Sequence, residues 1–194
     1  MRIGILAVQG DFEAHGRALA LLRAEAVYVR AADQLAGLAG LIIPGGESTT
    51  ILKFLHSEGL LEAIGDFAAE RPVMGTCAGA ILMATEVSRP AQTSLGLMDI
   101  GIERNAYGRQ VDSRIATLSP GADFTARTAC GPLEAVFIRA PIIRRTGPPV
   151  RVLLTYQGDP ILVEQGRHLA STFHPELTAD QRVHGLFLAK TAQP

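Results

Sequence analysis

Short apolar runs alternate with longer amphipathic segments through the first half of the chain, and this alternation constrains the fold more than any other feature. Residues 3–8 are continuously apolar, as expected for a strand that helices cover on both faces. Further strands are predicted at 26–30, 40–43 and 72–75, and helices at 11–24, 49–67 with a break near Gly59, and 78–86. Asp11 is expected to cap the first helix. The pattern predicts an α/β fold of three layers, α/β/α, with a mostly parallel central sheet.

The second half of the chain changes character. Gly, Pro and Asp separate six short strands, predicted at 100–105, 111–117, 135–138, 150–155, 161–165 and 169–172, and a closing helix is predicted at 180–190. Residues 119–132 are expected to form a variable surface loop. Because the chain has 194 residues and neither a repeat nor a linker, residues 1–194 are predicted to form a single domain.

Composition excludes several classes of protein. A hydrophobic share of 47% with a net charge of −1 excludes an intrinsically disordered chain. The 18 basic residues balance 19 acidic ones without a basic stripe, so we expect no nucleic-acid partner. The longest uncharged stretch, 72–85, is too short to span a bilayer and no targeting segment is visible, so neither a membrane nor an exported protein is predicted. Two cysteines make no disulfide framework, and the chain is expected to be soluble, reduced and cytoplasmic.

The sequence Gly75-Thr76-Cys77-Ala78-Gly79 has the form G-x-C-x-G between a predicted strand and a predicted helix. This is the cysteine form of a nucleophile elbow, in which a tight turn holds the reactive side chain above the sheet. At a helix N-terminus the dipole favours a thiolate, and the N–H of Ala78 points to where an oxyanion would form. A buried structural cysteine in a glycine-rich turn is the alternative interpretation.

A thiol nucleophile needs a base, and the base needs a group that orients it. His174-Pro175-Glu176 supplies both, because residues i and i+2 of an extended segment face the same side. Glu176 would fix the tautomer of His174 and stabilise the imidazolium. By itself this tripeptide is also compatible with an ordinary surface turn.

A third motif, residues 44–50 (PGGESTT), directly follows a predicted strand. Its adjacent glycines can expose backbone N–H groups to an oxyanion or a carboxylate. The spacing of a phosphate-binding loop is missing, and the plain alternative is a turn with Ser48 or Thr49 as the helix N-cap.

The other histidines and the second cysteine rank lower. His15, His56, His168 and His184 stand singly and are expected to be surface residues or internally hydrogen-bonded ones. No paired Cys or His spacing supports a zinc site at the three candidate residues, so no metal and no cofactor is expected. Cys130 is predicted to be incidental.

Taken together, the motifs resemble the class I (triad) glutamine amidotransferases. More closely, the chain resembles the family of glutaminase subunits of pyridoxal 5′-phosphate synthase over nearly its whole length. The motifs that carry the resemblance are LAVQGDFEAH, LIIPGGESTT, GTCAGAIL, RNAYGRQVDS, FIRAP and STFHPELT. Two residues depart from the family: Ala80 stands where a larger apolar residue, often Met, is expected, and Tyr107 stands where Phe is usual.

The resemblance implies roles for particular residues. Cys77 would be the nucleophile, His174 the general base and acid, and Glu176 the carboxylate that orients it. The oxyanion hole would use the backbone N–H groups of Gly46 and Ala78. L-Glutamine would contact the remaining family positions, which are Gly46, Glu47, Ser48, Arg104, Ile138 and Arg139.

The resemblance also implies a flavodoxin-like amidotransferase fold and a partner. Ammonia released from L-glutamine would pass to a barrel-shaped synthase subunit, and activity would depend on docking to that subunit. Two alternatives remain. One is another enzyme with a cysteine elbow, in which a histidine directly follows the cysteine, where Ala78 stands here, or the acid lies elsewhere in the sequence. The other is a catalytically silent interaction subunit.

Overall fold

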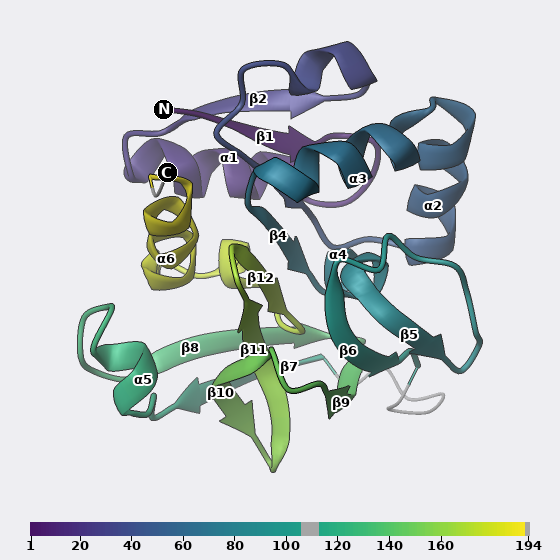
Figure 1. Cartoon of the computed structure of the whole chain (residues 1–194). Helices are drawn as coiled ribbons and strands as arrows, with labels where there is room; N and C mark the ends of the chain where they lie inside the picture. The colour runs from purple at the N-terminus through teal and green to yellow at the C-terminus, as the bar shows by residue number, and fades with distance from the viewer. Residues whose placement is uncertain (106–112, 193–194) are drawn as a thin grey trace.

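A computed structural model describes residues 1–105 and 113–192 of the chain (Figure 1). Tyr107 and the first two residues of the strand predicted at 111–117 lie outside this range. A seven-stranded sheet at the centre has the order β10-β11-β12-β4-β3-β1-β2. Its strands are β1 (Arg2–Leu6), β2 (Glu25–Val29), β3 (Gly40–Ile43), β4 (Val73–Thr76), β10 (Arg151–Tyr156), β11 (Asp159–Gln165) and β12 (His168–Ser171).

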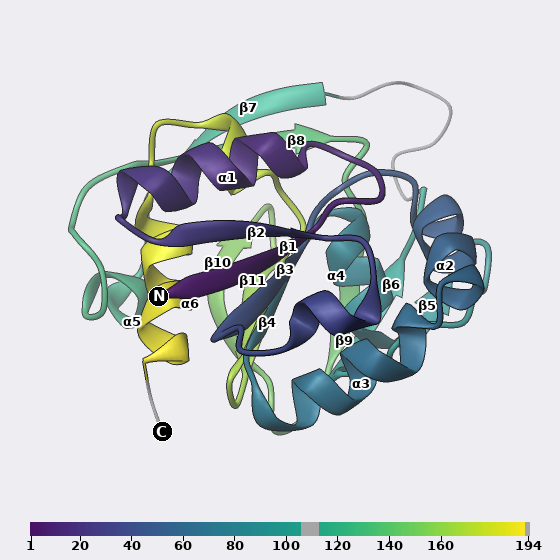
Figure 2. The same ribbon diagram turned by 90° about the horizontal axis from the view of Figure 1, so that it is seen from above.

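The central sheet is mostly parallel, as predicted. All neighbouring pairs from β12 to β2 run parallel, and only β10 and β11 are joined antiparallel at one edge. Figure 2 shows helices on both faces of this sheet, with α1 and α6 on one side and α2, α3 and α4 on the other. The helices are α1 (Phe12–Leu21), α2 (Ser48–Ser57), α3 (Leu60–Glu70), α4 (Ala78–Met83) and α6 (Arg182–Thr191).

Alternation along the strands divides the apolar interior into two clusters. Leu41 and Ile43 of β3 pack with the side of α2, α3 and α4, whereas Ile42 between them packs with the side of α1 and α6. Both faces of β3 are therefore buried, which explains why this strand is a continuous apolar run. The three-layer α/β/α prediction is confirmed.

Additional short strands extend each layer. A three-stranded sheet of β5 (Ala84–Ser88), β6 (Met98–Glu103) and β9 (Ile142–Thr146) lies on the side of α4, and a pair of β7 (Ser113–Leu118) and β8 (Leu133–Ile138) lies on the other side. The predicted helix at 78–86 is therefore wrong beyond Met83, because its last residues enter β5. The short helix α5 (Ala122–Thr125) interrupts the predicted loop at 119–132, and β9 was not predicted.

Local signals set the helix ends. The Asp11 carboxylate accepts a hydrogen bond from the N–H of Ala14, which confirms the predicted cap of α1. Gly59 adopts a left-handed conformation, with φ of 63°, and separates α2 from α3 as predicted. The N-cap of α2 is Glu47 and not Ser48 or Thr49, since the Glu47 side chain accepts from the N–H of Thr49.

The parallel strands bring three distant motifs to one edge of the sheet. Strands β12, β4 and β3 are direct neighbours, and near their carboxyl ends Ser171 pairs with Thr76 and Ile43 pairs with Gly75. The segments that follow these ends are the HPE, GTCAG and PGGESTT motifs. In a doubly wound sheet ligands bind outside the carboxyl ends of the strands.

None of the helices in the described ranges is long and apolar enough to cross a membrane.

Candidate active site

Cys77 occupies a sharp turn between β4 and α4. Its backbone has φ of 50° and ψ of −104°, a conformation that L-residues rarely adopt, and its N–H donates to the Ser171 carbonyl of the neighbouring strand at 2.8 Å. A Cβ at Gly79 would collide with the Ile43 carbonyl oxygen, so the turn has no space for a side chain there. The close approach of α4 to β3 confirms the predicted elbow.

His174 and Glu176 lie together, as predicted. Nδ1 of His174 is 2.7 Å from Oε1 of Glu176, and both side chains are nearly fully buried. The segment between them is not extended, because Pro175–Leu177 forms the 3-10 turn η2. The N–H of His174 donates to the Val136 carbonyl at 2.8 Å, which ties the turn to β8.

The surroundings of His174 favour its charged form. Burial by itself would lower the pKa of the imidazole, but the interactions with Cys77 and Glu176 outweigh burial and raise this pKa to about 10. At neutral pH the imidazole is therefore a cation between two groups that carry or can carry negative charge. The contact with Cys77 also places the imidazole beside the thiol.

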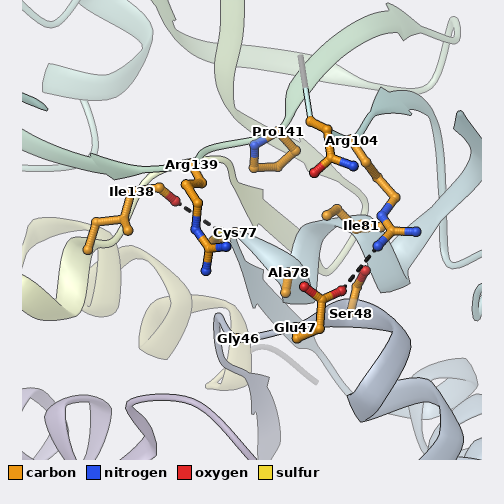
Figure 3. A pocket seen from close by; sticks show the side chains of 11 residues that line it. Gly46, Glu47, Ser48, Cys77, Ala78, Ile81, Arg104, Ile138, Arg139 and Pro141 are labelled. Carbon is orange, nitrogen blue, oxygen red and sulfur yellow. Dashed lines mark hydrogen bonds and ion pairs between the residues drawn. The ribbon is translucent and has the colours of Figure 1, made fainter. Parts of the chain in front are cut away.

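A pocket opens over Cys77 and holds the other predicted residues (Figure 3). Arg104 reaches across it to Glu47, with Nη2 and Oε1 3.1 Å apart, although the Arg104 guanidinium is mostly buried. The pocket lining includes every residue predicted to contact the substrate and both predicted oxyanion donors, namely Gly46, Glu47, Ser48, Ala78, Arg104, Ile138 and Arg139. His174 and Glu176 are not part of this lining.

Three further residues line the pocket and were not predicted. Asn105 directly follows the predicted Arg104, Pro141 lies two residues after the predicted Arg139, and Ile81 lies one helical turn after Cys77. A helix period applied to the elbow would have indicated Ile81. Asn105 and Pro141 would have followed from treating the RNAYGRQ and FIRAP motifs as whole segments.

The glycine-rich loop is held by two side chains that were not predicted to be site residues. Gln9, which follows β1, accepts a hydrogen bond from the N–H of Glu47 at 3.2 Å. The hydroxyl of Ser48 donates to Gln92 at 3.0 Å. These contacts connect the loop after β3 with two other segments, and they fix the start of α2 beside the pocket.

Two histidines that were expected to stand singly are buried side by side behind Glu176. Nδ1 of His15 lies 3.0 Å from Nε2 of His184, and Nε2 of His15 lies 3.2 Å from the Thr76 hydroxyl. The prediction that these histidines are internally hydrogen-bonded is confirmed for His15. The prediction that each stands singly is wrong, because His15 and His184 contact one another. Cys130 is exposed and is not among the residues that line the pocket over Cys77.

No group of three or more His, Cys, Asp or Glu side chains within 1–105 and 113–192 is arranged to hold a metal ion. The chemistry that the site offers is that of a thiol at an elbow, an imidazole beside it and a carboxylate behind the imidazole. A charged pair, Arg104 and Glu47, lies across the pocket from the thiol and suits a ligand with both an acidic and a basic group.

Solved structures with related folds define the class. One crystal structure of a glutamine amidotransferase superposes with a TM-score of 0.89 at 44% identity, covering 98% of this chain and 99% of that one. The structure of PurLQS from Thermotoga maritima has the same fold, with a TM-score of 0.71 at 18% identity over 97% of each chain. Fold and elbow together are those of the class I glutamine amidotransferases.

Sequence comparison narrows the class to one family. The chain belongs to the SNO glutamine amidotransferase family, whose pattern it matches over residues 5–193. It is 61% identical to the pyridoxal 5′-phosphate synthase subunit PdxT of Solibacter usitatus, over 97% of this chain and 98% of that protein. The PdxT subunit of Deinococcus radiodurans is 50% identical, over 97% and 96%.

Proposed function

We propose that this chain is the glutaminase subunit of a pyridoxal 5′-phosphate synthase, with residues 1–194 acting as one amidotransferase domain. It would hydrolyse L-glutamine to L-glutamate and ammonia for the synthesis of vitamin B6. The observation that carries the proposal is the pair of buried side chains at the elbow: the His174 imidazole adjoins Cys77 and is held at 2.7 Å by Glu176.

In the first half of the reaction, the Cys77 thiolate attacks the carbonyl carbon of the glutamine side-chain amide. The negative charge on the carbonyl oxygen is stabilised by the N–H of Ala78, at the start of α4, and by the N–H of Gly46. His174 then protonates the leaving nitrogen, so that ammonia departs and a thioester remains. Glu176 keeps the imidazole in place during both proton transfers.

In the second half, water attacks the thioester. The His174 imidazole, now neutral, takes a proton from that water, and cleavage of the C–S bond releases L-glutamate and regenerates the Cys77–His174 pair. The buried position of both side chains limits access of other water to the thioester.

The pocket suits the zwitterionic end of L-glutamine. Arg104 would bind the α-carboxylate and Glu47 the α-ammonium group, because one is cationic and the other anionic across the same opening. Ser48 and the backbone of Ile138 and Arg139 would complete the lining. Arg139 has a positive φ of 45°, which directs the chain sharply around the rim of the pocket.

The partner would be the ammonia-accepting synthase subunit. Free ammonia is readily protonated and lost in water, so release into a docked subunit is the effective arrangement. The name of the relatives supports this partner, since each is called a subunit of pyridoxal 5′-phosphate synthase. We expect weak activity from the chain alone. A cytoplasmic location stays a prediction from the sequence.

A glutamine-analogue diazoketone tests the assignment of the nucleophile. With the chain in complex with a cognate synthase subunit, mass spectrometry of the peptides should find the label on Cys77 and not on Cys130. The matched control is Cys130→Ser, which should be labelled like the wild type, while Cys77→Ser should remain unlabelled. Labelling of Cys130 alone, or equal labelling after Cys77→Ser, would contradict the proposal, and an unreactive Cys77 would favour a silent interaction subunit.

A further inference from the structure

A chain of buried polar side chains continues behind the Cys77, His174 and Glu176 group. Glu176 has one carboxylate oxygen on His174 and the other, Oε2, 3.5 Å from Nε2 of His15. His15 lies on α1 and contacts His184 on α6, with Nδ1 and Nε2 3.0 Å apart. Both histidines are completely buried. The two helices on one face of the sheet thus reach the carboxylate from behind.

The second oxygen of Glu176 needs a partner. Oε2 is buried and has no hydrogen bond of ordinary length within the described ranges. Burying part of a carboxylate without a donor is unfavourable, and the ring nitrogen that faces this oxygen is Nε2 of His15. Contacts in a catalytic site are often long before substrate binds and shorten in the complex.

Two groups face Nε2 of His15, and the carboxylate of Glu176 decides whether this nitrogen carries the proton, because the nearer Thr76 hydroxyl, at 3.2 Å, can donate or accept and so fits either tautomer. A carboxylate only accepts hydrogen bonds, so a protonated Nε2 is attracted to Glu176 and an unprotonated one is repelled. With the proton on Nε2, the Nδ1 of His15 accepts from the Nε2–H of His184. The remaining nitrogen of His184, Nδ1, has no partner in the described residues, which is less unfavourable for an acceptor than for a buried donor.

His15 acts here as a neutral donor. Burial, together with the charges of His184 and His174, holds the pKa of His15 well below its ordinary value. The titratable groups that face it are Glu176 of η2, His174 before η2 and His184 of α6, while Thr76 of β4 supplies a hydroxyl. A neutral N–H fixes the carboxylate without competing with His174 for its negative charge.

Resting on the function proposed above, we propose that His15, oriented by His184, is a positioning residue that holds the Glu176 carboxylate in line with His174. Oε1 of Glu176 then accepts a hydrogen bond from the imidazole of His174, and Oε2 accepts one from His15 of α1. Without the anchor, the carboxylate can rotate about its terminal bond and the imidazole loses its fixed orientation. Small misplacements of catalytic groups are known to lower rates by about 100-fold.

The tautomer can be measured directly on the wild-type chain. Nitrogen-15 NMR of the imidazole rings should find His15 and His184 neutral at pH 7, each with its proton on Nε2. This measurement needs no variant and no glutamine. A proton on Nδ1 of His15 would overturn the proposal, because Nε2 would then repel the carboxylate.

Alkylation of Cys77 by iodoacetamide tests the positioning. In His15→Leu, the midpoint of the acid side of the pH–rate curve should rise by about one pH unit, since Glu176 no longer supports the charge on His174. His15→Gln keeps a side-chain N–H near the position of Nε2 and should restore most of the wild-type curve. His168→Asn, which changes a half-buried histidine of β12, should leave the curve unchanged.

These outcomes separate positioning from folding and from function. Because an unfolded chain would also expose Cys77 to iodoacetamide, circular dichroism at each pH must first show that the variant is folded, and peptide mass spectrometry must separate Cys77 from Cys130. A His15→Leu curve identical to that of the wild type would overturn the proposal, as would a His15→Gln curve equally displaced. Failure of the wild-type complex to hydrolyse glutamine would contradict the proposed function and leave the alkylation result standing.

Discussion

Gly45 lies directly against the imidazole of His174: a Cβ at this position would be 2.5 Å from Cε1 of the ring and 3.4 Å from Cβ of Cys77. Both distances join the loop after β3 to the two reacting side chains. The absence of a side chain at Gly45 therefore lets the imidazole occupy its place between Glu176 and Cys77.

The first prediction concerns this close contact. Gly45→Ala should displace the imidazole and lower kcat for ammonia release by about 100-fold, because the added methyl group overlaps the ring. Ammonia release by the complex and thermal unfolding measure the two effects separately. The control is Gly65→Ala in α3, where a Cβ meets open space, and which should raise stability by about 0.5–1 kcal/mol without changing kcat. Equal kcat values in both variants would contradict the account.

Arg104 is predicted to bind the substrate and not to take part in the chemistry. Its Nη1 is buried and has no hydrogen-bond partner among the residues described, while Nη2 is held by Glu47. Arg104→Gln should raise KM for glutamine by about 10- to 100-fold, the effect of losing one charged hydrogen bond, with kcat nearly unchanged.

Steady-state ammonia release over a range of glutamine concentrations measures KM and kcat separately and so checks this prediction. Arg145→Gln is the matched control, because Arg145 pairs with Asp99 and Glu86 on the small sheet of β5, β6 and β9. It should leave KM at the wild-type value. A fall in kcat with unchanged KM for Arg104→Gln would show that the guanidinium serves another purpose.

The raised pKa of His174 predicts where activity is lost at alkaline pH. Since Cys77 and Glu176 raise this pKa to about 10 against the effect of burial, the imidazolium that protonates the leaving nitrogen persists up to about pH 10. Glu176→Gln removes one of the two supports, so the alkaline side of the kcat/KM profile should move down by at least about one pH unit. Glu70→Gln, on the exposed end of α3, should not move it.

A histidine that stays neutral in the folded chain predicts a loss of stability in acid. Burial, with Arg167 and Lys190 nearby, lowers the pKa of His168 to about 4. A lowered pKa means that the unfolded chain binds the proton first, so the stabilising contribution is complete above about pH 6.5 and is lost as the pH falls toward 4.

Replacing His168 should therefore flatten the acid slope. His168→Asn keeps an acceptor for the N–H of Val73, and its loss of unfolding free energy between pH 7 and pH 4.5 should be smaller than that of the wild type by about 1–2 kcal/mol, allowing for partial exposure. Urea unfolding at the two pH values measures the difference. The exposed His56→Asn variant should keep the wild-type slope, and an unchanged slope for His168→Asn would contradict the argument.

Local sequence patterns were sufficient to predict the elements of the fold that form from consecutive residues. Apolar runs placed β1, β3 and β4, and the elbow glycines placed Cys77 at the end of a strand. The predicted helix after Cys77 was too long because Ala84, Thr85 and Glu86 include neither Gly nor Pro to mark the end of a helix. Only its tertiary partner β6 makes residues 84–88 a strand.

The histidines behind the active site could not be predicted in this way. His15 and His184 are 169 residues apart, and neither stands in a motif that points to the other. Their contact depends on α1 and α6 lying on the same face of the sheet, which is a property of the whole topology. The contribution of Gly45 is likewise visible only once β3 and β12 end beside β4.

Ammonia release by the assembled complex tests the central claim, that Cys77 is the nucleophile of a glutaminase. With a cognate synthase subunit present, the wild type and Cys130→Ala should release ammonia from L-glutamine at equal rates, and the wild type alone should be much slower. Cys77→Ala should release at least about 1,000-fold less than the wild type in the complex, since no other group there can form the thioester. Full glutamine hydrolysis by Cys77→Ala would contradict the mechanism.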